Sequence, residues 1–119
     1  MALTPSSPLA GGRLAHSWGT VTPRVEIDEV SKWVWDSTND LDKVVIDNLE
    51  RLAKERGIPM AQMSLAWMLS KPYITAPIVG TTAVQHVEDA VAALDVELSD
   101  DEIQELENPY VTHPVLGMM

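Results

Sequence analysis

Residues 57–93, GIPMAQMSLAWMLSKPYITAPIVGTTAVQHVEDAVAA, decide the fold because this stretch predicts a helix, a strand and a second helix in succession. Gly57 supplies a left-handed stop to whatever precedes it. A helix is then expected from Pro59, because proline is favoured in the first turn, and Lys71 with Pro72 ends it. Its sequence is apolar almost all round, which predicts burial on several sides. The apolar residues are Met60, Met63, Leu65, Ala66, Trp67, Met68 and Leu69.

The second half of this stretch predicts a strand that runs directly into a helix. Residues 76–80 form a short apolar run with a β-branched pair, which is typical of a strand buried on both faces. Thr82 and Gln85 form a predicted capping box for the helix that follows. The unpaired N–H groups at such a helix start suit a phosphate, although a plain structural junction needs no ligand. The apolar residues of this helix share one face: Val84, Val87, Val91 and Leu94.

Two further helices are predicted on either side of this stretch. Downstream, Ser99 and Glu102 form a second predicted capping box, at the start of a short helix. Upstream, residues 40–54 show helical spacing, with charged side chains on one face and apolar side chains on the other. The apolar face of the upstream helix is expected to hold Leu41, Val44, Val45, Leu49, Leu52 and Ala53.

The order of elements predicts a single partial α/β domain over residues 1–119 that is predominantly helical. Residues 1–14 are expected to form a strand-like segment and a loop, since the prolines there exclude a helix. Residues 15–38 are predicted to be an irregular loop. The helices and the second strand fall within residues 39–107, and residues 108–119 form a proline-punctuated tail.

Composition excludes several function classes. The formal net charge is −10, from 18 acidic and 8 basic residues, and such a surface repels nucleic acid and anionic membranes. The chain has no cysteine, which excludes disulfides and thiolate chemistry. No apolar run reaches the roughly 18 residues of a membrane span. The three histidines lack the spacing of metal ligands, so no metal site is expected. We therefore expect an acidic, cytoplasmic protein.

Three segments resemble the aldo-keto reductase family. They are residues 57–93, residues 7–14 (SPLAGGRL) and residues 95–107 (DVELSDDEIQELE), and they occur in the family's order. Residues 7–14 resemble the loop after the family's seventh strand, and residues 76–80 its eighth strand. The resemblance implies the C-terminal βα units of a TIM barrel, present as an incomplete barrel fragment.

The resemblance also implies an NADP(H)-dependent oxidoreductase acting on carbonyl groups and alcohols. In the family, the loop after strand seven lies near the cofactor pyrophosphate. The loop after strand eight and the next helix hold the adenosine phosphate. The implied cofactor-binding residues are Ser7, Pro8, Leu9, Ala10, Gly80, Thr82, His86 and Asp89. Two positions depart from many relatives, which have Asn at Ala90 and Gln at His86. His86 can still bind a phosphate, or it is an ordinary helix-surface histidine.

The catalytic set of the family has no counterpart in this sequence. That set is a Tyr acid supported by Lys and Asp, with a nearby His, and it belongs to the family's early strands. Tyr73 and Tyr110 do not match the catalytic position, and neither has a lysine at a spacing that suggests acid support. No catalytic residue is therefore assigned, and the isolated chain is expected to be inactive.

Three functions stay open at this point. The chain is a portion of a reductase, a small dinucleotide-binding module without catalysis, or a protein-interaction module without a ligand. Affinity for NADP(H) separates the last two, and an adjoining reading frame for the upstream βα units would favour the first. Open strand edges are prone to pair with other chains. We therefore expect self-association or association with the missing barrel portion.

Overall fold

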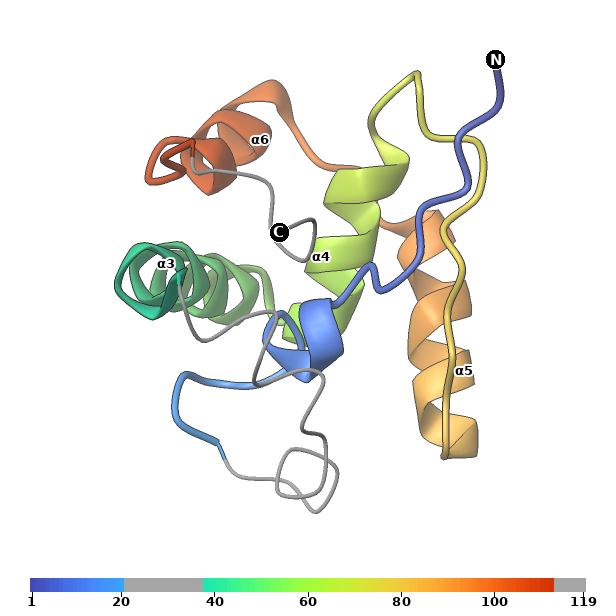
Figure 1. Cartoon of the computed structure of the whole chain (residues 1–119), viewed down its shortest axis with the longest axis horizontal. Coiled ribbons are helices and arrows are strands. Elements are labelled where there is room, and N and C mark those ends of the chain that lie inside the picture. Colours follow the sequence, from blue (N-terminus) through green and yellow to red (C-terminus); the bar gives the residue numbers. More distant parts are fainter. Residues whose placement is uncertain (21–37, 113–119) are drawn as a thin grey trace.

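The structure, a computed structural model, describes residues 1–20 and 38–112. It confirms a predominantly helical chain: η1 (Ala10–Gly12), α3 (Asn39–Arg56), α4 (Met60–Leu69), α5 (Val84–Ala92), η3 (Ala93–Asp95) and α6 (Asp100–Glu107). Helix α4 lies between its neighbours, with α3 and α6 on one side and α5 on the other (Figure 1). Most of the predicted loop and part of the predicted tail fall outside the described residues. No described helix is both long and apolar enough to cross a bilayer.

The core forms where α4 meets α3 and α6. Met63 of α4 is fully buried, with no exposed surface, and its burial confirms the prediction for this helix. Pro59 is the extended residue just before the helix, so α4 begins at Met60, one residue later than predicted. The other buried members of the core cluster come from α3 and α6, and they are Leu49, Leu52, Ala53 and Leu106. The buried area between these helices supplies the main hydrophobic stabilisation of the described chain.

Helix α3 ends at the predicted residue, but the side chains that it buries differ from the predicted apolar face. Gly57 adopts a left-handed conformation (φ 74°) and its N–H donates to the carbonyl of Lys54 at 3.1 Å. Ile46 is buried although it was not assigned to the core, whereas Val44 is 56% exposed. Two residues turn a helix by about 200°, so these two side chains lie on opposite sides. Leu41 is also more exposed than predicted, at 39%.

The predicted strands are wrong for the described residues, where one isolated parallel bridge between Ser6 and Ile78 replaces them. The backbone N–H of Ile78 donates to the carbonyl of Pro5 at 2.8 Å. Ile78 is 57% exposed, so residues 76–80 are not buried on both faces. A parallel strand needs a paired neighbour along its length, and these two segments meet at only one residue pair.

The predicted capping box at Thr82 and Gln85 is also wrong. Helix α5 begins at Val84, preceded by Ala83 in an extended conformation, and no side chain caps it. The side-chain amide of Gln85 instead donates to Asp89, four residues later, at 3.1 Å. Because Gln85 points along the helix, it does not reach back to the helix start.

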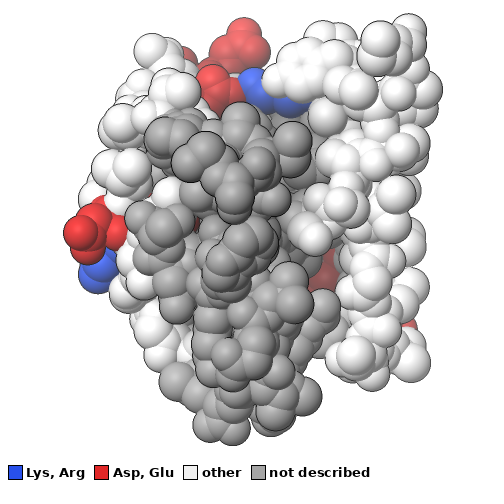
Figure 2. Space-filling model, viewed as in Figure 1, with Lys and Arg blue, Asp and Glu red and all other residues white. Residues whose placement is uncertain are grey.

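The apolar residues of α5, together with Leu94 of η3, are turned outward. Val84, Val87, Val91 and Leu94 are 76%, 48%, 59% and 69% exposed. The opposite side of α5 contacts α4 with small or polar residues such as Ala90, which is half-buried. Figure 2 shows the flank over α5 as largely free of charged side chains.

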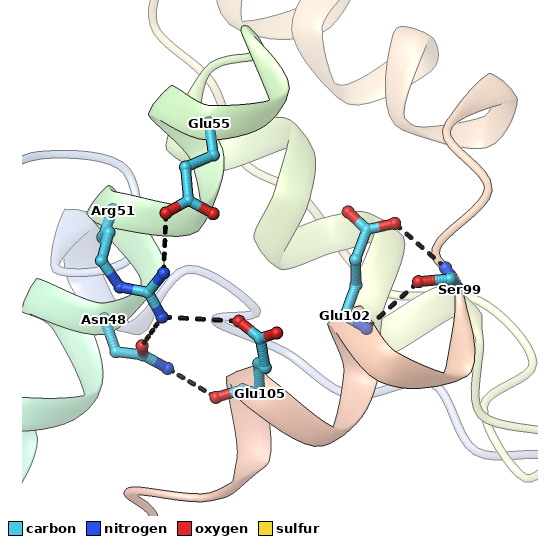
Figure 3. Close-up of polar contacts among 6 residues, drawn as sticks. All are labelled: Asn48, Arg51, Glu55, Ser99, Glu102 and Glu105. Carbon is cyan, nitrogen blue, oxygen red and sulfur yellow. Dashed lines mark hydrogen bonds and ion pairs between the residues drawn. The ribbon is translucent and has the colours of Figure 1, made fainter.

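Helix α6 starts with the capping box predicted from the sequence (Figure 3). The Ser99 hydroxyl accepts from the backbone N–H of Glu102 at 3.2 Å, and the Glu102 carboxylate accepts from the backbone N–H of Ser99 at 3.1 Å. Both bonds satisfy donors that a helix start leaves unpaired. The cap therefore fixes where α6 begins.

Polar contacts then fasten α6 to α3. Arg51 donates to the side-chain oxygen of Asn48 at 2.9 Å and to the carboxylate of Glu105 at 3.5 Å (Figure 3). The amide of Asn48 donates to the backbone carbonyl of Glu105 at 2.6 Å. Nearer the end of α3, Arg56 donates to the carboxylate of Glu102 at 2.6 Å. This hydrogen bond to Arg56, helped by the one from the Ser99 backbone, lowers the pKa of Glu102.

Replacing the core methionine tests this packing. Met63→Ala should lower the free energy of unfolding by about 2–5 kcal/mol, since it removes buried methylene groups and leaves a cavity. Denaturant unfolding followed by circular dichroism measures the change. The exposed Val44→Ala serves as control and should change stability by less than about 0.5 kcal/mol. Equal effects of the two substitutions would contradict the described core.

The ion pair of Glu102 predicts a pH-dependent stability. The pKa of Glu102 is lower in the folded chain, so its stabilisation is present above the unfolded pKa of about 4.3 and is lost as pH falls through the folded pKa. Glu102→Gln can keep the capping box but loses the ion pair. The difference in melting temperature between wild type and variant should shrink between about pH 7 and pH 3.

The matched control is Glu88→Gln, at an exposed position of α5. This variant also removes one carboxylate, so it shows how much of the change comes from the loss of one negative charge alone. A constant difference for Glu102→Gln would count against the ion pair with Arg56.

Candidate functional site

The parallel bridge brings the two predicted cofactor segments to one end of the molecule. Ser6 and Ile78 pair in parallel, so the chain leaves both residues in the same direction. Ser7 follows the first, and Gly80 comes two residues after the second. In parallel α/β arrangements, ligands gather at the carboxyl ends of the strands. The chain segments that start at Ser7 and Gly80 therefore leave the bridge in the same direction.

The turn after Ser6 has an unusual backbone. Ser7 and Ala10 both have φ of 51°, in the left-handed region that side chains rarely adopt. Each such residue costs roughly 1–2 kcal/mol, and this kind of strain is concentrated at functional sites. The turn is closed by the N–H of Ala10 donating to the Ser7 carbonyl at 3.0 Å, and by the N–H of Leu14 donating to the Leu9 carbonyl at 3.2 Å.

Within the turn, the four predicted residues differ in exposure. Ser7 is exposed, Leu9 and Ala10 are half-buried, and Pro8 is buried. Pro8 and Ala10 line an apolar cavity of about 630 Å³ bounded by α3, α4 and α6, with Trp67 and Tyr73 among its other walls. The turn therefore presents Ser7 to solvent and anchors itself through Pro8.

Arg13 attaches the turn to α3, a role that the sequence did not reveal. Its guanidinium donates to the side-chain oxygen of Asn39 at 2.7 Å and pairs with Asp42 at 3.3 Å. It also lies 5.5 Å from the ring centroid of Trp18, within cation–π range. One arginine after two glycines carries no sequence signal for such an anchor, because its partners lie far along the chain.

The second segment presents Gly80, Thr82 and His86 to solvent. His86 is the third residue of α5, and its backbone N–H donates to the Ala83 carbonyl at 3.1 Å. With no side-chain cap, the first N–H groups of α5 point out of the helix start. Backbone donors of this kind suit an anion.

Asp89 has a structural role within the described chain. Its carboxylate accepts from the side-chain amide of Gln62 on α4 at 3.3 Å and from that of Gln85 at 3.1 Å. The bond from Gln62 joins α5 to α4, and the bond from Gln85 lies within α5. They also turn the carboxylate toward amides, so a direct contact with a cofactor phosphate would bring two negative groups together.

Lys71 lies two residues before Tyr73 in the sequence. Lys71 pairs with the carboxylate of Glu107 and lies 5.0 Å from the ring centroid of Trp67. The hydrogen bond from Lys71, followed by that from Trp67, lowers the pKa of Glu107. Lys71 therefore joins the end of α4 to α6. The described residues contain no group of three side chains arranged to hold a metal ion.

Comparison with known proteins identifies the family of this chain. The sequence profile of the Aldo/keto reductase family matches residues 1–110. The chain belongs to the aldo/keto reductase family. It is 42% identical over 113 residues to the versiconal hemiacetal acetate reductase of Aspergillus parasiticus, which is 93% of this chain and 33% of that protein. It is 37% identical to an aldo-keto reductase of Fusarium vanettenii and 35% identical to one of Metarhizium robertsii. Each match extends over 119 residues, which is 98% of this chain and 31% of the relative.

Membership of the aldo/keto reductase family confirms the resemblance found in residues 7–14 and 57–93. The chain spans about a third of the length of the curated relatives it matches. The family implies an oxidoreductase that uses a nicotinamide cofactor. The cofactor-binding roles of the individual residues stay predictions.

The strained turn gives a test of the local geometry. Ala10→Gly should leave the free energy of unfolding unchanged or raise it by up to about 1 kcal/mol, because glycine adopts φ of 51° without strain. The matched control, Ala90→Gly inside α5, should cost about 1 kcal/mol. Chemical denaturation measures both. An equal loss of stability in the two variants would contradict the left-handed conformation at Ala10.

Proposed function

We propose that this chain is the cofactor-binding portion of an NADP(H)-dependent aldo/keto reductase, an enzyme that interconverts carbonyl compounds and alcohols. The observation that carries the proposal is the parallel bridge between Ser6 and Ile78, with both following loops at one end. Family membership supports the reaction class. The Aspergillus relative is a versiconal hemiacetal acetate reductase, which is consistent with the same class.

The residues at this end fit a dinucleotide phosphate. Ser7 offers an exposed hydroxyl in the turn, and the start of α5 offers backbone N–H groups without a side-chain cap. His86 adds a ring that can donate to a phosphate oxygen. It is the one basic side chain on α5, because the sequence contains no Lys or Arg after Lys71. We therefore assign the pyrophosphate to the turn and the adenosine phosphate to α5.

We further propose that the isolated chain does not catalyse the reaction. When bound, the cofactor supplies the hydride, but a reaction also requires the carbonyl and a proton donor to be held against it. Tyr73 is 58% exposed, and its neighbour Lys71 is paired with Glu107. The relatives are about three times as long as this chain, so they contain residues with no counterpart here.

An amide-proton NMR correlation spectrum recorded with and without NADPH tests the cofactor assignment. We expect weak binding, in about the millimolar range, with shifts confined to residues 7–10 and 80–89. His86→Gln should weaken NADPH binding by up to about tenfold, since it removes one phosphate donor. Val44→Ala, at an exposed position of α3, should leave the shifts unchanged.

Dispersed peaks that stay in place, or that move elsewhere, would contradict the assignment. Oxidation of NADPH by the isolated chain in the presence of a simple aldehyde would contradict the proposed lack of activity.

A further inference from the structure

The turn at residues 7–12 needs support from outside itself. Ser7 and Ala10 have φ of 51°, and Gly11 and Gly12 have φ of 68° and 97°. A residue other than glycine stays in this left-handed region only where the surrounding structure holds it there. The backbone hydrogen bonds inside the turn close it on itself, but they do not fix its position relative to the helices. That position is therefore set by the attachments on either side of the turn.

The attachment before the turn is made by the backbone. The N–H groups of Thr75 and Ile78 donate to the carbonyls of Leu3 and Pro5, at 2.9 Å and 2.8 Å. These bonds hold the chain as far as Ser6, the residue that pairs with Ile78 in the bridge. They fix the chain where it enters the turn and leave the other end of the turn to be held by other contacts.

The attachment after the turn is made by the side chain of Arg13. One nitrogen of its guanidinium donates to the side-chain oxygen of Asn39 at 2.7 Å, and the other donates to the carboxylate of Asp42 at 3.3 Å. These two acceptors are three residues apart on α3, so they lie on the same side of that helix. Because the guanidinium is planar and rigid, two acceptors fix its orientation as well as its position.

The contact between Arg13 and Asp42 is partly shielded from water. The two side chains are 21% and 26% exposed, so dissolved salt screens their attraction less than that of a fully exposed pair. Asp42 is itself held in place, because its carboxylate also accepts from the hydroxyl of the buried Thr38 at 2.6 Å. The contact therefore joins the turn to a fixed point on α3.

Two other side chains hold the segment that follows the turn. The hydroxyl of Ser64 on α4 lies 2.9 Å from the Leu14 carbonyl, and the hydroxyl of Ser17 donates to Glu50 at 2.7 Å. Each is a single hydrogen bond, and neither donor is charged. Hydrogen bonds from a charged donor are stronger, and Arg13 makes two of them at the residue next to the turn.

We propose that Arg13 is a positioning residue for the cofactor: by joining the turn to α3, it holds the backbone of residues 7–10 where it meets the cofactor pyrophosphate. The guanidinium is directed at α3, so it acts on the cofactor through the turn. This inference rests on the proposed function, which assigns the pyrophosphate to this turn. It adds that the affinity of the turn for the cofactor depends on a contact with the start of α3.

The test compares two ligands in NMR titrations of the full 119-residue chain. NADPH contains the pyrophosphate, whereas its adenosine bisphosphate half lacks the pyrophosphate bridge and is assigned to α5 alone. Arg13→Ala should reduce the NADPH-induced shifts at residues 7–10 by about half or more, and should weaken NADPH binding about threefold or more. Binding of the adenosine bisphosphate, with its shifts at residues 80–89, should match wild type. A general loss of structure would weaken both ligands together.

Two milder variants separate the contact from the rest of the arginine. Asp42→Asn removes the partner's charge but keeps an oxygen for Thr38, so it should reproduce part of the loss. Combined with Arg13→Ala it should add nothing further, because both substitutions remove the same contact. Arg13→Lys keeps the charge but loses the planar fork, so its NADPH affinity should be intermediate. These variants also carry the comparison if Arg13→Ala does not fold.

The matched control is Arg51→Ala. It removes the same charge and breaks an ion pair of α3, in this case with Glu105 of α6. NADPH binding to this variant should be the same as to wild type.

Three results would overturn the proposal: NADPH shifts at residues 7–10 that are equal in Arg13→Ala and wild type, an equal loss of affinity for both ligands, or additive losses in the double variant. A wild-type chain in which NADPH shifts no peak at residues 7–10 would instead contradict the pyrophosphate assignment. Failure of this inference is therefore distinguishable from failure of the proposed function.

Discussion

The burial of α4 is the constraint on which the other described elements depend. This helix is apolar around most of its circumference, and Met63 at its centre is fully buried. Leu49 and Leu52 of α3 cover one side of the core, and Leu106 of α6 closes it. On the other flank, α5 approaches with small and hydrogen-bonding residues. Close approach there requires small side chains, which leaves the larger ones of α5 on the outside.

The sequence predicted best those features that depend on neighbouring residues alone. The left-handed stop at Gly57 and the capping box at Ser99 and Glu102 are confirmed because each is complete within a few residues. The strand at 76–80 failed because strands need partners elsewhere in the chain. The Thr82 cap failed because Gln85 has a competing acceptor four residues ahead, in Asp89.

The candidate site was predictable as a set of segments but not in its details. The loops around Ser7 and Gly80 were located by family resemblance, and the bridge places them at one end. The left-handed conformation of Ala10 could not be predicted, since alanine rarely adopts it. The roles of Arg13 and Asp89 could not be predicted either, because each is fixed by partners on a different helix.

The ion pairs that attach α6 to α3 have a consequence for local unfolding of the chain. Its links to α3 at Arg51 and Arg56 are ion pairs near the surface, which dissolved salt screens over about 8–10 Å. The apolar contacts of α4 respond far less to ionic strength. Dissolved salt therefore weakens the attachment of α6 to α3 more than the packing of α4. Local unfolding of α6 removes Leu106 from the core cluster, and this exposes one side of Met63 to water.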